Sequence, residues 1–141
     1  MAEIIENAIY SLLTQDADIS SMVGNRVYPS DLPQMYILPA ITFFRVSSVQ
    51  IQTHTEGMPN PRFQVDSWAE TNDDTAQLAT YVKNLLNGFK GTISVDGTNY
   101  NISASLIAGD QGPLRRPLAA EPDNPEPGIY HEIQDYLLWW R

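Results

Sequence analysis

Histidine and carboxylate side chains are the groups in this sequence that could bind a metal ion. The two histidines, His54 and His131, have no neighbouring Cys. They are also too far apart in the sequence to form the H-x-x-x-H spacing that places two imidazoles on one helix face. The segment 16–20 has the Asp-x-Asp-x-Ser spacing that opens a calcium loop, but Ser21 and Val27 stand where such a loop needs Gly and Glu. The sequence therefore predicts neither a metal site nor a cofactor.

Two doublets of like charge are the remaining candidates for chemistry. Asp73 and Asp74 could act as a general acid and base, but they follow Thr71 in what we expect to be the first turn of a helix, where the macrodipole favours negative charge. The basic doublet Arg115-Arg116 indicates either a specific intersubunit contact or a solvated loop. No nucleophile elbow, P-loop or dinucleotide-binding motif occurs. We therefore predict that the protein is not an enzyme and has no catalytic residues.

Amino-acid composition limits the classes of function that remain. A length of 141 residues predicts a single domain, 1–141. Seventeen acidic against eight basic side chains give a net charge of −9, which disfavours a sequence-independent grip on nucleic-acid phosphates. There is no Cys, and hence no disulfide or thiolate site. The first twenty residues lack a basic region and a long apolar run, so we expect neither a signal peptide nor a membrane span.

The elements that would position any site are organised around residues 62–69. Apolar and polar side chains alternate there, as in a strand, and a helical period follows over residues 70–88. Thr71 or Asn72 is the expected N-cap of that helix, and Gly88 is the expected glycine of its C-terminal turn. The pattern predicts a strand that leads directly into an amphipathic helix lying on a sheet.

Other segments show shorter patterns. Before residue 62, they are an amphipathic helix at 2–15, a turn and short helix at 16–24, a brief extended segment at 26–29, a strand at 40–50 and a loop or long hairpin tip at 50–61. After residue 88, they are a hairpin at 92–102 around Asp96-Gly97, a Pro-rich extended loop at 109–128 and a closing strand at 129–141. The strands at 40–50 and 129–141 carry large apolar groups on both sides, so each needs a second partner. We predict an α+β fold in which a mostly antiparallel sheet of about four to five strands is packed by the N-terminal and central helices, with long Pro-rich loops.

In this order, the segments resemble the tail-completion or tail-terminator proteins of long-tailed bacteriophages, a family also found in prophages and gene transfer agents. The residues that carry the resemblance cover most of the chain outside 109–128. They are Ala8–Leu13 (AIYSLL), Asp16–Asp18 (DAD), Val23–Pro29 (VGNRVYP), Leu38–Thr42 (LPAIT), Phe63–Ala69 (FQVDSWA) and Gln134–Trp139 (QDYLLW).

The resemblance implies a structural virion protein that is assembled in the bacterial cytoplasm. It would form a homo-hexameric ring on the head-proximal end of the tail tube, stop tube polymerisation and join the tail to the head connector or stopper protein. DNA would pass through the ring without sequence-specific binding, and no membrane is involved. Two alternatives differ in class: a head-side neck or stopper protein, and a small ligand-binding regulatory domain.

We expect contacts with other subunits on the loops and at the chain's end. The candidate interface residues are Tyr28, Gln52, His54, Glu56, Met58, Arg115, Arg116, Leu118 and Trp140.

Overall fold

The computed structural model describes residues 5–51, 58–117 and 128–140, with three helices and six strands in those ranges. In chain order they are α1 (Ile5–Gln15), α2 (Ala17–Val23), β1 (Val27–Pro29), β2 (Ala40–Ile51), β3 (Met58–Ala69), α3 (Asn72–Leu86), β4 (Gly91–Val95), β5 (Thr98–Pro117) and β6 (Gly128–Trp140). The strands form one sheet in the order β1-β2-β3-β6-β5-β4, and every neighbouring pair is antiparallel except β1 and β2. The α+β fold and its mostly antiparallel sheet are thus as predicted. The sheet has six strands because the brief segment Val27–Pro29 also pairs.

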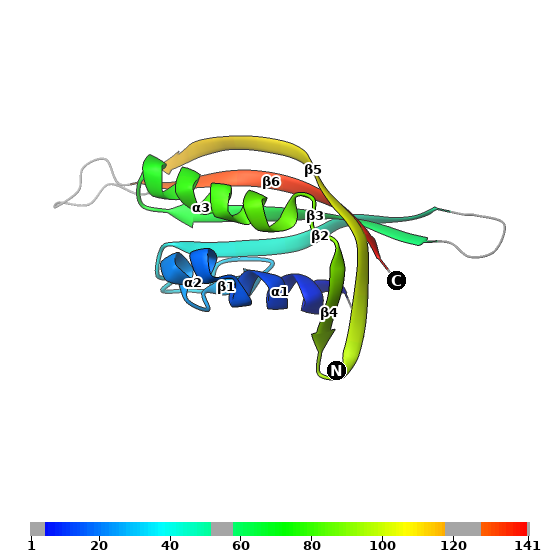
Figure 1. The fold of residues 1–141 in the computed structure, drawn as a ribbon. Coiled ribbons are helices and arrows are strands. Elements are labelled where there is room, and N and C mark those ends of the chain that lie inside the picture. The colour runs from blue at the N-terminus through cyan, green and yellow to red at the C-terminus, as the bar shows by residue number, and fades with distance from the viewer. Residues whose placement is uncertain (1–4, 52–57, 118–127, 141) are drawn as a thin grey trace.

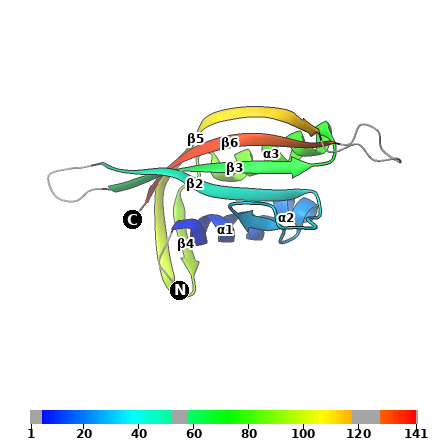
Figure 2. The same ribbon diagram turned by 180° about the vertical axis from the view of Figure 1, so that it is seen from behind.

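The helices cover one face of the sheet and leave the other face without a helix (Figures 1 and 2). Alternation along the central strand β3 explains the division, because Phe63 and Val65 point into the core while Gln64 and Trp68 point to the opposite face. From β6, Tyr136 and Leu138 join the same core. None of the helices in the described ranges combines the length and apolar character needed to cross a membrane.

Helix α3 is shorter than the predicted 70–88, but one of its two expected N-caps and the glycine of its C-terminal turn are confirmed. The Thr71 hydroxyl accepts a hydrogen bond from the backbone N–H of Asp74 at 3.1 Å, which makes Thr71 the N-cap. Asp73 and Asp74 lie in the first turn, and Gly88, just past the last turn, has a φ of +85°. The position of the two carboxylates is therefore explained by helix capping and by the macrodipole.

The hairpin formed by β4 and β5 also follows the prediction. Asp96 and Gly97 both have positive φ, at 50° and 84°, as a two-residue type I′ turn requires. The neighbouring rungs pair Val95 with Thr98 and Ser94 with Asn99. A local sequence signal was therefore sufficient for this element.

The predicted Pro-rich loop at 109–128 is wrong for its first part. Residues 109–117 continue β5 and pair with β6, and residues 118–127 lie outside the described residues. Pro113 is accommodated because no strand lies on the outer side of β5 there, in the described residues, and because the register shifts between Gln111 and Leu114. Gly112, with a φ of 123°, is required at this bulge because a Cβ would lie 3.0 Å from the carbonyl oxygen of His131.

The described residues of the segment 50–61, predicted as a loop or the tip of a long hairpin, belong to strands. Rungs from Ser47–Arg62 to Ile51–Met58 continue the β2–β3 ladder, while residues 52–57 lie outside the described residues. Pairing between β3 and β6 stops at Arg62, so residues 47–51 and 58–61 form a two-stranded arm that extends beyond the sheet (Figure 1). We call this segment the β2–β3 arm. A two-stranded hairpin is marginally stable by itself in water.

The burial of leucines on β5 and β6 predicts unequal effects of two leucine truncations. Leu138 is 1% exposed in the core, whereas Leu106 on β5 is 50% exposed. We expect Leu138→Ala to lower the free energy of unfolding by about 2–5 kcal/mol, because it removes buried methyl groups and leaves a cavity. The matched control Leu106→Ala should cost less than about 1 kcal/mol. Urea denaturation of both variants tests this, and equal losses would contradict the assignment of the two faces.

Candidate functional site

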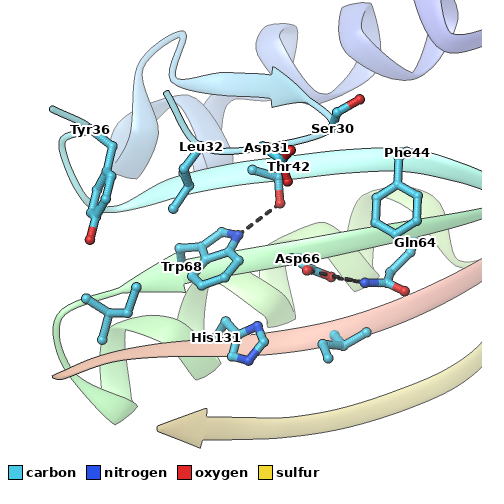
Figure 3. A pocket seen from close by; sticks show the side chains of 12 residues that line it. Ser30, Asp31, Leu32, Tyr36, Thr42, Phe44, Gln64, Asp66, Trp68 and His131 are labelled. Carbon is cyan, nitrogen blue, oxygen red and sulfur yellow. Dashed lines mark hydrogen bonds between the residues drawn. The ribbon is translucent and has the colours of Figure 1, made fainter. Parts of the chain in front are cut away.

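A pocket of about 700 Å³ lies on the helix-free face of the sheet, beneath the segment that connects β1 to β2 (Figure 3). Strands β2, β3 and β6 form its floor, and residues 30–36 of the connection form its rim. The lining residues are Ser30, Asp31, Leu32, Tyr36, Thr42, Phe44, Gln64, Asp66, Trp68, Ile129, His131 and Ile133. The pocket therefore combines aromatic, aliphatic and acidic groups, a composition typical of surfaces that bind other molecules.

Trp68 is the centre of the pocket floor. Its ring stacks on that of His131, its direct neighbour across β3 and β6, with 4.5 Å between ring centroids and 20° between planes. Its indole N–H donates a 2.9 Å hydrogen bond to the Thr42 hydroxyl on β2 (Figure 3). These interactions hold the three strands' side chains in fixed positions, so the floor is preorganised.

Carboxylates on this face are engaged by neighbouring side chains. The Gln64 amide donates to the Asp66 carboxylate at 3.0 Å, and both residues project from β3 into the pocket (Figure 3). Farther along, Arg62 forms an ion pair with Asp135 at 2.9 Å. The face thus presents a mixture of charges, in contrast to the basic groove that a nucleic-acid backbone requires.

Exposed apolar side chains gather beside the pocket. In the β1–β2 connection, Met35 is 97% exposed and Ile37 is 64% exposed. Phe44 and Val46 on β2 are also exposed, and Phe44 lines the pocket. Exposed apolar groups near a hollow are typical of a protein interaction site.

A cluster of polar side chains from β5 and β6 lies on the helix-covered face of the sheet, under α3. Glu132 forms a hydrogen bond with Asp110. Burial is the main cause that raises the Glu132 pKa to about 7, and the hydrogen bond and the negative charge of Asp110 add to it. Lys83 has a smaller, opposing effect on this pKa. Nearby, Gln134 donates to the Ala79 carbonyl at 3.1 Å and accepts from the Tyr136 hydroxyl at 3.0 Å. Burial and the same two carboxylates raise the Tyr136 pKa. These hydrogen bonds therefore join β6 to β5 through Asp110 and to α3 through the Ala79 carbonyl.

The predicted interface residues whose side chains are described lie on different strands of the sheet. Tyr28 is half-buried on β1, and Arg115 is exposed on β5, at the opposite margin of the sheet. Trp140 packs against the core at the end of β6, with its ring 5.7 Å from that of Tyr100. Met58 and Arg116 lie on strands β3 and β5, but their side chains are not described. The remaining predicted interface residues, Gln52, His54, Glu56 and Leu118, fall outside the described residues.

Sequence reasoning missed the pocket residues themselves. The alternation over residues 62–69 indicated that Trp68 and Phe63 lie on opposite faces, but nothing local paired Trp68 with His131. Likewise, nothing in the sequence marks the run Met35-Tyr36-Ile37, which lies between the segments assigned at 26–29 and 40–50, as exposed. Among residues 5–51, 58–117 and 128–140, no group of three or more His, Cys, Asp or Glu side chains could hold a metal ion.

The protonation of Glu132 predicts a pH dependence of stability. Its pKa is about 7 in the fold against an ordinary 4.5, so the folded state binds a proton more tightly than the unfolded state. The associated stabilisation is complete below about pH 4.5 and is lost as the pH rises to about 7. We expect Glu132→Gln, which keeps a neutral hydrogen-bonding group, to be more stable than the parent at pH 8 by about 1–3 kcal/mol and to show little difference at pH 4.5.

Urea unfolding at both pH values measures this effect. The control Glu70→Gln alters an exposed carboxylate and should change stability little at either pH. A gain from Glu132→Gln that is the same at pH 4.5 and 8 would show that the carboxyl group does not titrate differently in the fold.

Comparison with known proteins adds a family and a fold. Residues 7–105 match the family described as tail completion protein gp17. The structure is similar to that of a chain in the virion of a native gene transfer agent particle, with a TM-score of 0.72 and 13% sequence identity over 99% of this chain and 98% of the other. A comparison with curated protein sequences finds no match. Since the family match spans well over half of the sequence, the chain belongs to the tail completion protein gp17 family.

Proposed function

We propose that this tail completion protein is the terminator of the tail tube. It forms a homo-hexameric ring on the head-proximal end of the tube, stops further addition of tube subunits and joins the tail to the head connector. The observation that carries the proposal is the family match over residues 7–105. The fold shared with a chain of a gene transfer agent virion supports a place in the particle.

The described surfaces support an assembly role. The helix-free face carries a preorganised pocket floor, the β1–β2 connection exposes Met35 and Ile37, and the β2–β3 arm extends away from the sheet. Such features have no evident use in an isolated chain, but they offer several separate contacts to neighbours. We infer that the protein acts by fitting against its own copies, the tube and the connector, without making or breaking bonds.

Termination follows from a difference between the two ends of the ring. One end must match the last ring of the tube, and the other must be incompatible with a further tube subunit, so that growth stops by mismatch. A net charge of −9 per chain would discourage adhesion of the DNA that passes through. A head-side stopper would share these surface properties, but it would bind the connector and leave tube growth unaffected.

Tube growth in the presence of the purified protein tests the proposal. We expect added protein to cap growing tubes of the cognate tube subunit, giving shorter tubes with a ring at one end in electron micrographs. Native mass measurements across a concentration series should show six copies. Tubes of unchanged length and without rings would contradict terminator function, and connector binding alone would favour the stopper.

The exposed apolar residues of the β1–β2 connection predict a variant that separates assembly from folding. We expect Met35→Asp combined with Ile37→Asp to weaken ring formation or attachment to the tube at least tenfold, because charge replaces apolar groups that a neighbour would cover. The melting temperature should change little, since both side chains are exposed in the single chain. Gln34→Asp, also exposed in the same connection, is the matched control for added charge. Normal assembly by the double variant would place this connection outside every interface.

A further inference from the structure

Strand β2 has a long free edge on its outer side. The short strand β1 pairs with it only from Ile41 to Phe43. From Phe44 to Ile51, no other strand of the described residues lies on that side. The backbone groups on this edge are therefore available for a further strand.

Strand β5 has a comparable free edge at the opposite margin of the sheet. Strand β4 pairs with it only from Thr98 to Ile102. The end of α3 then covers two backbone groups, since the Gly88 N–H donates to the Ser105 carbonyl and the Asn87 side chain accepts from the Ile107 N–H. From Ala108 onward, no other strand of the described residues lies on the outer side.

The other exposed edges are short or interrupted by proline. In the β2–β3 arm, the β3 edge contains Pro59 and Pro61, which cannot donate hydrogen bonds. The margin at β1 is a three-residue strand that ends at Pro29. Such features commonly prevent edge-to-edge association. The β2 edge has eight residues without proline, from Phe44 to Ile51. The free β5 edge has five, from Ala108 to Gly112, as many as β4, and it ends at Pro113.

Strand directions make the two free edges compatible. The three ladders that join β2 to β3, β3 to β6 and β6 to β5 are all antiparallel, so β5 runs opposite to β2. If a second copy is placed beside the first in the same orientation, its β5 edge therefore meets the β2 edge as an antiparallel pair. We propose that copies of this chain associate by such pairing, with residues 44–51 of one copy forming a ladder with residues 108–112 of the next.

The contact is heterologous, because the two edges are different parts of the chain at opposite margins of the sheet. A heterologous contact gives a closed ring when its rotation closes and an open filament when it does not. The inference therefore rests on the proposed ring and specifies which surfaces join it. Pairing of backbone groups would also give the two-stranded β2–β3 arm a third strand, which such an arm needs for stability.

The positions of the edges also fit a closed sheet. Gly109 pairs directly with Asp135 on β6, and Phe44 pairs with Gln64 on β3, which itself pairs with Asp135. Phe44 and Gly109 therefore lie at the same level along the strands. The free edges run in opposite directions from that level, so full overlap of 108–112 with 44–51 requires a shift of about three to six residues, or ~10–20 Å, along the strands. The repeat across β2, β3, β6 and β5 is about 19 Å wide. Such a shift corresponds to a strand tilt of about 30–45°, which overlaps the range for closed barrels.

Cross-linking tests the contact cleanly, because the natural chain contains no cysteine. The double variant Val46→Cys with Gln111→Cys places one exposed thiol on each edge. A short bis-maleimide tolerates a slip of one or two residues. We expect a ladder of covalent oligomers that stops at six from the double variant, and mixed dimers when the two single-Cys variants are combined.

The control pairs Val46→Cys with Gln77→Cys, an exposed position on α3, and should give at least tenfold less cross-linked product. A second measurement uses the unmodified protein: amide hydrogen exchange at 44–51 and 108–112 should slow by at least tenfold in the assembled form relative to the monomer.

The outcomes separate this inference from the proposed function. A hexamer that shows neither cross-linking above the control nor slower exchange at both edges would overturn edge pairing and leave the ring intact. Single-Cys variants that cross-link only with themselves would indicate a two-fold contact and would also overturn it. A ladder that continues past six would support the edge contact and contradict the closed ring. A chain that stays monomeric at every concentration would contradict both.

Discussion

The structure depends on the pairing of β3 with β2 on one side and β6 on the other. Because side chains alternate along a strand, this double register decides which residues face the helices and which face the open side. It puts Phe63 and Val65 in the core and brings Trp68 against His131 on the opposite face. A slip of one residue would exchange these roles, so the core and the pocket are specified together.

The sequence predicted the elements that have local causes. Thr71 and Gly88 bounded α3 correctly, and Asp96-Gly97 located the β4–β5 turn, because caps and tight turns depend on neighbouring residues. Residues 109–117 were predicted as loop because Pro113 and Pro117 argue against a strand. The error has a physical reason: pairing with β6 comes from a distant segment, and an edge tolerates proline where a central strand does not.

The candidate site was less predictable than the fold. Arg115 and Trp140 were proposed for an interface by residue type; they lie on β5 and β6, with Trp140 partly buried against the core, and their interface role stays a prediction. The pocket instead depends on Trp68, His131 and Thr42, which belong to three strands and meet only through long-range register. No spacing in the sequence encodes that meeting. The exposure of Met35 is similarly a property of the folded connection.

Free strand edges and a large net charge have opposite effects on association. Backbone groups on β2 and β5 that pair with no other strand in the described residues favour addition of a further strand, while a charge of −9 on every copy opposes close approach. Electrostatic repulsion between exposed charges extends over roughly one Debye length, about 8 Å at physiological salt, whereas backbone hydrogen bonds act only on contact. This repulsion therefore opposes the association of free chains at low concentration. If the protein is the proposed terminator, a tube end that holds several copies side by side would offset the repulsion, and ring closure would be favoured at the place where termination is needed.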